Sequence, residues 1–187
     1  MHYALTDFLQ DIFQNSVEAQ AGLIVIDLIE DPEKYLIYVA DNGRGMSQAV
    51  LRQALDPFFT SGEKHRRRRV GLGLAFLNQA VKAVDGDFEI KSEEGTGTSV
   101  VFSFPKKHLD CPPLGDLPGT LLLMFAYPGA YELNVTRQLN GQKYTVLRSE
   151  LQAAAGDWTD AQSLKLAGAY LAGLEEDLML SSGAPGG

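Results

Sequence analysis

The feature that most constrains this chain is a carboxylate at the end of an apolar strand pattern, followed by a glycine-rich turn. Residues 35–40 are Tyr-Leu-Ile-Tyr-Val-Ala, and residues 41–46 continue as Asp-Asn-Gly-Arg-Gly-Met. A buried carboxylate is costly without donors, so we expect Asp41 to accept hydrogen bonds from backbone N–H groups or from a ligand. Gly43 and Gly45 allow positive φ and let a flat ring approach the backbone. Taken alone, the pattern also fits a tight turn between a strand and a helix.

Composition is that of a soluble globular protein. The 187 residues are 45% hydrophobic and 21% charged, and the formal net charge is -8. An acidic chain argues against general binding to nucleic acid or to anionic membranes. The single Cys111 excludes an internal disulfide. No apolar run approaches the roughly 20 residues that span a bilayer. The chain does not begin with a basic leader. We therefore expect a cytoplasmic protein without nucleic-acid or membrane partners.

Hydrophobic periodicity predicts the order of helices and strands. Apolar spacings of three and four favour helices over 3–19, 46–55, 70–84, 117–127, 149–155 and 160–179. Alternating and β-branched runs favour strands over 23–29, 35–41, 88–92, 98–104, 131–138 and 143–148. Asn140-Gly141 between the last two runs predicts a hairpin. The last helix offers leucines for packing at Leu164, Leu166, Leu171, Leu174 and Leu178.

These elements divide the chain into a larger and a smaller part. We expect a first unit over 1–105, which ends at Pro105, and a proline-rich connector over 106–118. A small unit of helix, hairpin and helices follows over 119–180. The last residues, 181–187, are rich in glycine and serine, which predicts a disordered tail.

A second glycine pair, Gly71-Leu72-Gly73, lies where a helix is predicted to begin. Free backbone N–H groups and the helix dipole at such a position favour an anion. Residues 66–69 are four arginines just before it, which favours a polyphosphate ligand. By themselves the arginines also fit a solvated surface run or a nucleic-acid patch. The sequence lacks a P-loop, and neither glycine pair has the third glycine of the dinucleotide fingerprint.

Five short motifs follow one another along the chain, at residues 11–19, 41–46, 57–60, 71–74 and 95–98. Together they resemble the N, G1, F, G2 and last glycine boxes of the GHKL superfamily with the Bergerat fold, the ATPases shared by DNA gyrase B subunits, heat-shock chaperones, histidine kinases and mismatch-repair proteins. The resemblance implies an α/β (α+β) two-layer sandwich, in which helices cover a mixed, mostly antiparallel sheet, with a small α+β C-terminal extension. Residues 9–19 and 112–116 look more closely like stand-alone ATP-binding proteins of anaerobic bacteria, encoded near iron hydrogenase subunits.

The resemblance implies a role for each matched residue, with ATP and Mg²⁺ as cofactors. Asp41 would accept the adenine N–H with support from Thr98, and Asn15 would offer an oxygen to Mg²⁺. Lys64, His65 and the four arginines would form a lid over the phosphates. The implied nucleotide-binding residues are Asn15, Ala19, Asp41, Gly43, Gly45, Met46, Thr60, Arg69, Gly71, Leu72, Gly73, Leu74 and Thr98.

Asp11 stands where many family members place a glutamate that activates water. Its side chain is one methylene shorter, which argues against rapid hydrolysis. His2, His65 and His108 do not lie in a phosphoacceptor pattern, so we expect no autophosphorylation of the histidine-kinase type by this chain alone.

Two function classes remain. The first, which we favour, is a switch in which ATP or ADP controls the binding of a protein partner to the lid and C-terminal region. The second is an enzyme, either a serine/threonine protein kinase of the anti-sigma-factor type or a slow ATPase. The resemblance leaves the partner unidentified, and both a link to hydrogenase function and a homodimer stay open.

Overall fold

One six-stranded sheet organises the computed structural model, which describes residues 4–56 and 72–183. The strands are β1 (Leu23–Glu30), β2 (Lys34–Asp41), β3 (Phe88–Glu93), β4 (Gly97–Pro105), β5 (Glu132–Leu139) and β6 (Gln142–Leu147). Their order is β3-β4-β2-β1-β5-β6, in which β1 and β5 run parallel and every other neighbouring pair is antiparallel.

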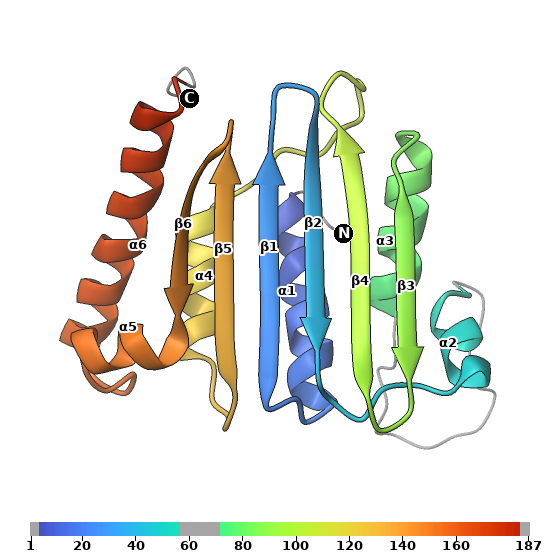
Figure 1. Ribbon diagram of the computed structural model, residues 1–187, viewed down its shortest axis with the longest axis horizontal. Coiled ribbons are helices and arrows are strands. Elements are labelled where there is room, and N and C mark those ends of the chain that lie inside the picture. Colours follow the sequence, from blue (N-terminus) through green and yellow to red (C-terminus); the bar gives the residue numbers. More distant parts are fainter. Residues whose placement is uncertain (1–3, 57–71, 184–187) are drawn as a thin grey trace.

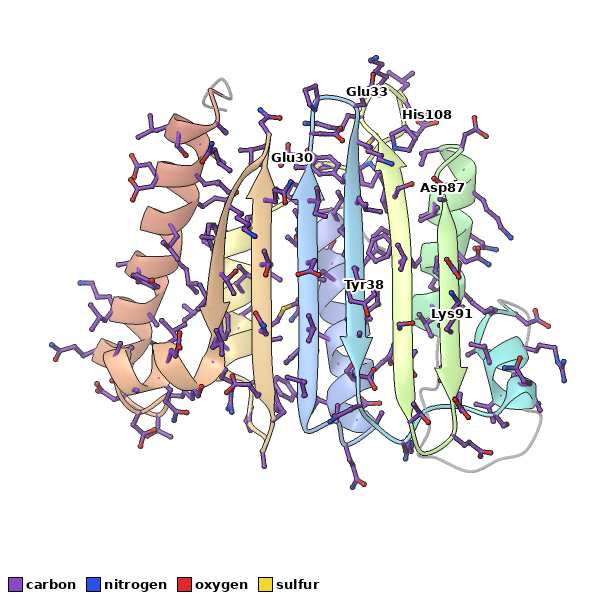
Figure 2. The ribbon with its side chains drawn as sticks, viewed as in Figure 1. Glu30, Glu33, Tyr38, Asp87, Lys91 and His108 are labelled. Atoms are coloured by element: carbon purple, nitrogen blue, oxygen red, sulfur yellow. The ribbon has the colours of Figure 1, made fainter. Side chains whose placement is uncertain are left out.

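Helices lie on one face of this sheet and at its two edges, β6 and β3 (Figure 1). They are α1 (Leu5–Glu18), α2 (Gln48–Ala54), α3 (Leu72–Ala83), α4 (Leu117–Ala126), α5 (Arg148–Ala155) and α6 (Ala161–Ser181). Figure 1 shows α1, α3 and α4 behind the strands and α6 beside β6. Tyr38 and Lys91 are drawn on the face turned away from these three helices (Figure 2). The mixed, mostly antiparallel α+β sandwich expected from the sequence is therefore confirmed.

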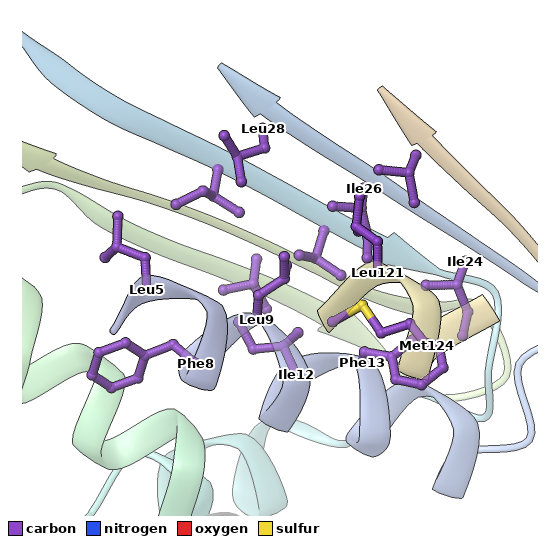
Figure 3. Packing of buried hydrophobic residues seen from close by; sticks show 14 of the residues in the cluster. Leu5, Phe8, Leu9, Ile12, Phe13, Ile24, Ile26, Leu28, Leu121 and Met124 are labelled. Carbon is purple, nitrogen blue, oxygen red and sulfur yellow. The ribbon is translucent and has the colours of Figure 1, made fainter. Parts of the chain in front are cut away.

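The alternating pattern of β1 explains why α1 packs against it. Ile24, Ile26 and Leu28 are at most 2% exposed, and they point to the same face of the sheet. Figure 3 shows the apolar stripe of α1, including Leu9 and Ile12, packed beneath them. Fully burying an apolar side chain of this size stabilises the fold by about 1.5–3 kcal/mol. This layer fixes α1 under the centre of the sheet.

The C-terminal part of the chain completes the same sheet. β5 lies beside β1, and the turn to β6 has φ of 49° at Asn140 and 88° at Gly141. Two positive φ values are those of the tight turn that Asn-Gly favours, so the predicted hairpin is confirmed. The expectation that Leu166 packs in the interior was wrong, because this residue of α6 is 55% exposed.

A buried ion-pair network holds α6 to the sheet. Arg137 on β5 is 1% exposed, and its Nε donates to Glu175 Oε1 on α6 at 3.1 Å. Its other end pairs with Glu30 at the end of β1, which also accepts from Lys106 Nζ at 2.8 Å. The Tyr144 hydroxyl donates to Glu175 Oε2 at 3.0 Å. These side chains join β1, β5, β6, the connector and α6.

Acid should weaken the contribution of Glu30 to this network. Burial alone would raise the pKa of Glu30, but hydrogen bonds and charge attraction from Lys106 and Arg137 outweigh it and hold the pKa below its ordinary value of 4.5. A lowered folded-state pKa gives stability that is present above the ordinary value and is lost as the pH falls through the folded value. We expect the difference in unfolding free energy between the parent and Glu30→Gln to shrink as the pH falls below about 4.5, in urea titrations. Glu33→Gln at an exposed position is the control, and an undiminished Glu30→Gln effect would contradict this prediction.

Candidate nucleotide site

Asp41 ends β2 with both carboxylate oxygens hydrogen-bonded. Oδ2 accepts from the Ser16 hydroxyl of α1 at 2.8 Å, and Oδ1 accepts from the Gly43 backbone N–H at 2.9 Å. These two bonds supply the donors that a half-buried acid at a strand end requires, as we expected. Each oxygen keeps a further acceptor site, because a carboxylate oxygen carries two lone pairs. Asp41 can therefore accept from a ligand without giving up its protein partners.

Thr98 lies directly opposite Asp41 on β4. Its hydroxyl is 2.8 Å from the Ser92 hydroxyl of β3, and Ser92 Oγ also accepts from the Met46 backbone N–H at 2.9 Å. Ser92 thus links the turn after Asp41 to β3 and β4. Sequence reasoning missed both Ser92 and Ser16, and only the pairing of residues far apart in the chain brings them to this site.

The two glycines of the turn permit close packing against the end of α1 and against the β3–β4 turn. A Cβ on Gly43 would lie 2.8 Å from the Ala19 Cβ and 2.9 Å from the Ala19 carbonyl oxygen. Gly45 has φ of 63°, and a Cβ there would lie 1.9 Å from the Glu93 carbonyl oxygen. The Arg44 N–H donates to the Ala19 carbonyl at 3.0 Å. A side chain at position 43 would displace the turn from the end of α1, and one at position 45 would displace it from the end of β3.

The start of α3 meets α1 at Asp11. Asp11 and Asn15 are four residues apart and share one flank of α1. A Cβ on Gly73 would lie 2.9 Å from Asp11 Oδ2, so only a glycine lets the first turn of α3 come this close. Leu72 opens the helix, and Leu74 has its side chain buried in the core. The first backbone N–H groups of α3 have no partner within the helix, which is the condition for binding an anion.

Helix α1 is therefore the common neighbour of Asp41 and Gly73. Asp41 reaches it at Ser16 and Gly73 reaches it at Asp11, with Asn15 between the two contacts. The site residues that we expected at Thr60, Arg69 and Gly71 lie outside the described residues, as do the expected F box and the lid.

A hollow of about 820 Å³ opens beside Asp41 and Thr98. Its volume is in the range of small-molecule sites, about 300–1,000 Å³. The described residues that line it come from the ends of β2, β3 and β4 and from the start of α2, and they include Asp41, Met46, Ser47, Ser92, Glu93, Gly97 and Thr98. Asn15 and Gly73 are not in this lining. Lys91, on the face of the sheet turned away from α1 (Figure 2), also lines the hollow, so the hollow surrounds the ends of these strands and is not confined to the α1 side.

Asn15 fits the role of a magnesium ligand in its chemistry and its place. Its side chain is half-buried on the flank of α1 that faces the start of α3, and no hydrogen bond joins its amide to another residue in the described part of the chain. Groups of three or more His, Cys, Asp or Glu side chains that could hold a metal are absent among the described residues. Mg²⁺ bound together with a nucleotide needs only one or two protein oxygens, because phosphates and waters fill its other positions.

Comparison with known proteins shows the family to which this chain belongs. Residues 3–108 match the family described as histidine kinase-, DNA gyrase B-, and HSP90-like ATPase, which is more than half of the chain. The chain belongs to this family. Family membership confirms the superfamily expected from the five motifs and supports ATP binding by the first unit.

The relatives include sensor and sporulation kinases. The chain is 33% identical over 99 residues to sporulation kinase C and 33% identical over 110 residues to sensor histidine kinase WalK, both of Bacillus subtilis (strain 168). These matches cover 52% and 55% of this chain but 22% and 18% of the relatives, so the chain spans about a fifth of their length. A solved catalytic domain of histidine kinase ThkA is 23% identical, with a TM-score of 0.41, over 54% of this chain and 64% of that domain. No helix in the described residues is long and apolar enough to cross a membrane.

Proposed function

We propose that this chain binds Mg–ATP and that the bound nucleotide controls a protein partner. Asp41 accepts a hydrogen bond from the adenine amino group, with Thr98 beside it. The first backbone N–H groups of α3, at Gly73, bind the phosphates. Asn15 supplies an oxygen to the Mg²⁺ that the phosphates also hold. The observation that carries this proposal is the contact of Asp41 and Gly73 with one helix, α1, on either side of Asn15.

The opposite flank of α1 supports a role as a switch. Phe13 lies 5.6 Å from the Tyr131 ring and 5.9 Å from the Tyr127 ring, both in the loop between α4 and β5. Arg148 at the start of α5 lies 4.4 Å from the Tyr131 ring. The connector also contacts α1, since its Pro113 carbonyl accepts from the Leu5 N–H at 2.9 Å. A change of α1 position on nucleotide binding would therefore act directly on the C-terminal region, where a partner would bind.

The test is a calorimetric titration of the full chain with ATP, ADP, AMP and GTP, each with and without Mg²⁺. We expect ATP to bind more tightly than AMP, since AMP lacks the phosphates for α3, and we expect Mg²⁺ to increase that difference. Asn15→Ala should weaken Mg–ATP by about five- to tenfold, the loss of one polar ligand interaction, and should leave metal-free ATP nearly unchanged. Gln14→Ala is the matched control, because Gln14 is an exposed neighbouring amide that bonds Glu18. If Asn15→Ala lowers the ATP affinity equally with and without Mg²⁺, Asn15 is not a ligand of the metal.

A partner controlled by the switch should bind the ATP and ADP states with different affinities. The chain resembles proteins encoded near iron hydrogenase subunits, so these subunits are the first candidate partners to test. A candidate that binds both states equally would not be the regulated partner, because a ligand shifts a conformational equilibrium only through different affinities.

The alternative is an enzyme, either a serine/threonine protein kinase or a slow ATPase. The position of the Asp11 carboxylate against Gly73 favours it, because a base at that place would lie beside the expected phosphate site. Transfer of ³²P from labelled ATP to a purified partner would identify a kinase, and release of labelled phosphate that Asp11→Asn abolishes would identify an ATPase. Binding of Mg–ATP without either reaction would favour the switch.

A further inference from the structure

The edge of the sheet at β6 has backbone groups without a partner among the described residues. In a two-residue hairpin, Leu139 and Gln142 next to the turn bond each other, and bonded pairs then alternate with non-bonded pairs. Lys143 and Thr145 fall in the non-bonded pairs, so their N–H and C=O groups point away from β5. In the described residues, no backbone hydrogen bond reaches either of these two residues from outside the hairpin. This edge can accept a further strand.

An apolar groove of about 360 Å³ borders the end of this edge that leads into α5. Thr145 and Val146 form its β6 side, and α5 and α6 form the rest. Leu166 and Tyr170 of α6 line it while being 55% and 52% exposed. Figure 1 shows α6 beyond β6, on the side away from β5. A strand added to β6 would cover these two exposed side chains.

We propose that the β6 edge and this groove bind one extended segment of a partner protein, which adds a seventh strand to the sheet. Backbone bonds to Lys143 and Thr145 hold the segment, and its alternate apolar side chains enter the groove over Val146, Leu166 and Tyr170. Glu150 is the charged residue in the groove lining, so the segment carries a basic residue beside it. This mode of recognition combines backbone hydrogen bonds for affinity with side-chain pockets for specificity.

The size of the groove favours a single segment over a second copy of the chain. Nine described residues line the groove, whereas a stable protein interface uses about 20–30 residues from each side. A segment of five or six residues matches the length of β6, which spans Gln142–Leu147. A dimer through β6 is kept as an outcome of the test.

The first experiment selects binders from a displayed library of linear twelve-residue peptides on the full chain. We expect the recovered peptides to alternate apolar and polar residues and to contain a lysine or arginine, a preference that Glu150→Lys should remove. Leu166→Asp, Tyr170→Asp and Thr145→Pro should each weaken a selected peptide by about tenfold or more. Proline at Thr145 removes an outward N–H group, a change that an edge strand tolerates. Leu123→Asp is the matched control, because Leu123 on α4 is 59% exposed and does not line the groove.

Amide exchange measured by NMR then locates the bound peptide. We expect the Lys143 and Thr145 amides to exchange more slowly when the peptide is bound, while amides of the opposite edge strand β3 keep their rates. The proposal is overturned if the library yields no binder, if binders survive the groove substitutions, or if β3 is protected instead. A dimer whose Lys143 and Thr145 amides are protected without any peptide would assign this edge to a second copy. Because none of these readouts requires nucleotide, their failure is distinct from a failure of ATP binding.

Discussion

Asp41→Asn should weaken ATP binding by about ten- to a hundredfold and should reduce the preference for ATP over GTP. A hydrogen bond to a charged group contributes about 1.5–3 kcal/mol, and the amide can present a donor where adenine also presents one. The affinity for GTP should fall less, because guanine places a carbonyl where adenine has its amino group. Calorimetric titration of the parent and the variant with both nucleotides measures the two affinities.

The substitution is a sharp test because the surrounding bonds can survive it. The asparagine oxygen can still accept from the Gly43 N–H, and its NH₂ group can donate to the Ser16 hydroxyl, which is 2.8 Å from the present carboxylate. Ser16→Ala is the matched control, since it removes one bond to Asp41 and leaves the carboxylate in place. We expect Ser16→Ala to weaken ATP by less than Asp41→Asn and to keep the preference for ATP. If Asp41→Asn binds ATP as the parent does, Asp41 does not contact the base.

The parts of the fold that depend on short-range pattern were predictable from the sequence. Asn140-Gly141 specified the hairpin because few other dipeptides accept two positive φ values. Serine is a residue type that favours helix N-caps, and the Ser47 Oγ accepts from the Val50 N–H at the start of α2. The alternation that ends at Asp41 specified a strand with a polar end, and that carboxylate has the donors it required. In each case the physical cause lies within a few residues of the signal.

The contacts that join distant segments were not predictable in the same way. Ser16 is 25 residues from Asp41, and Ser92 is 46 residues from Met46, so no local spacing points to either bond. The role of Thr98 came only from the family resemblance. The position of Arg137 in the strand pattern does predict a buried ion pair. Arg137 shares the buried register of β5 with Val135 and Leu139, and an arginine at such a position needs buried acidic partners. The acidic partners of Arg137 could not be predicted, because they depend on the order of the strands in the sheet.

Arg137→Ala should be among the most destabilising single substitutions in the C-terminal part. It leaves Glu175 buried without its cation and Glu30 with Lys106 alone, and breaking a buried pair in this way costs about 3–5 kcal/mol. Urea unfolding followed by circular dichroism measures the loss. Lys107→Ala is the control, since it removes the same charge from an exposed pair with Glu33 and should change the stability little.

The physical cause can be separated from a simple loss of packing. If the cost arises from unpaired acids, the triple variant Arg137→Met, Glu175→Leu and Tyr144→Phe should recover most of the stability, because apolar side chains of similar size replace a buried ion pair at little cost. Lowering the pH below about 4.5 should also narrow the stability gap between the parent and Arg137→Ala, because Arg137 helps hold the pKa of Glu30 below its ordinary value and that stabilisation is lost as Glu30 becomes protonated. A gap that is independent of pH, together with no recovery in the triple variant, would assign the loss to the cavity instead. The ion pairs would then not be what holds α6 to the sheet.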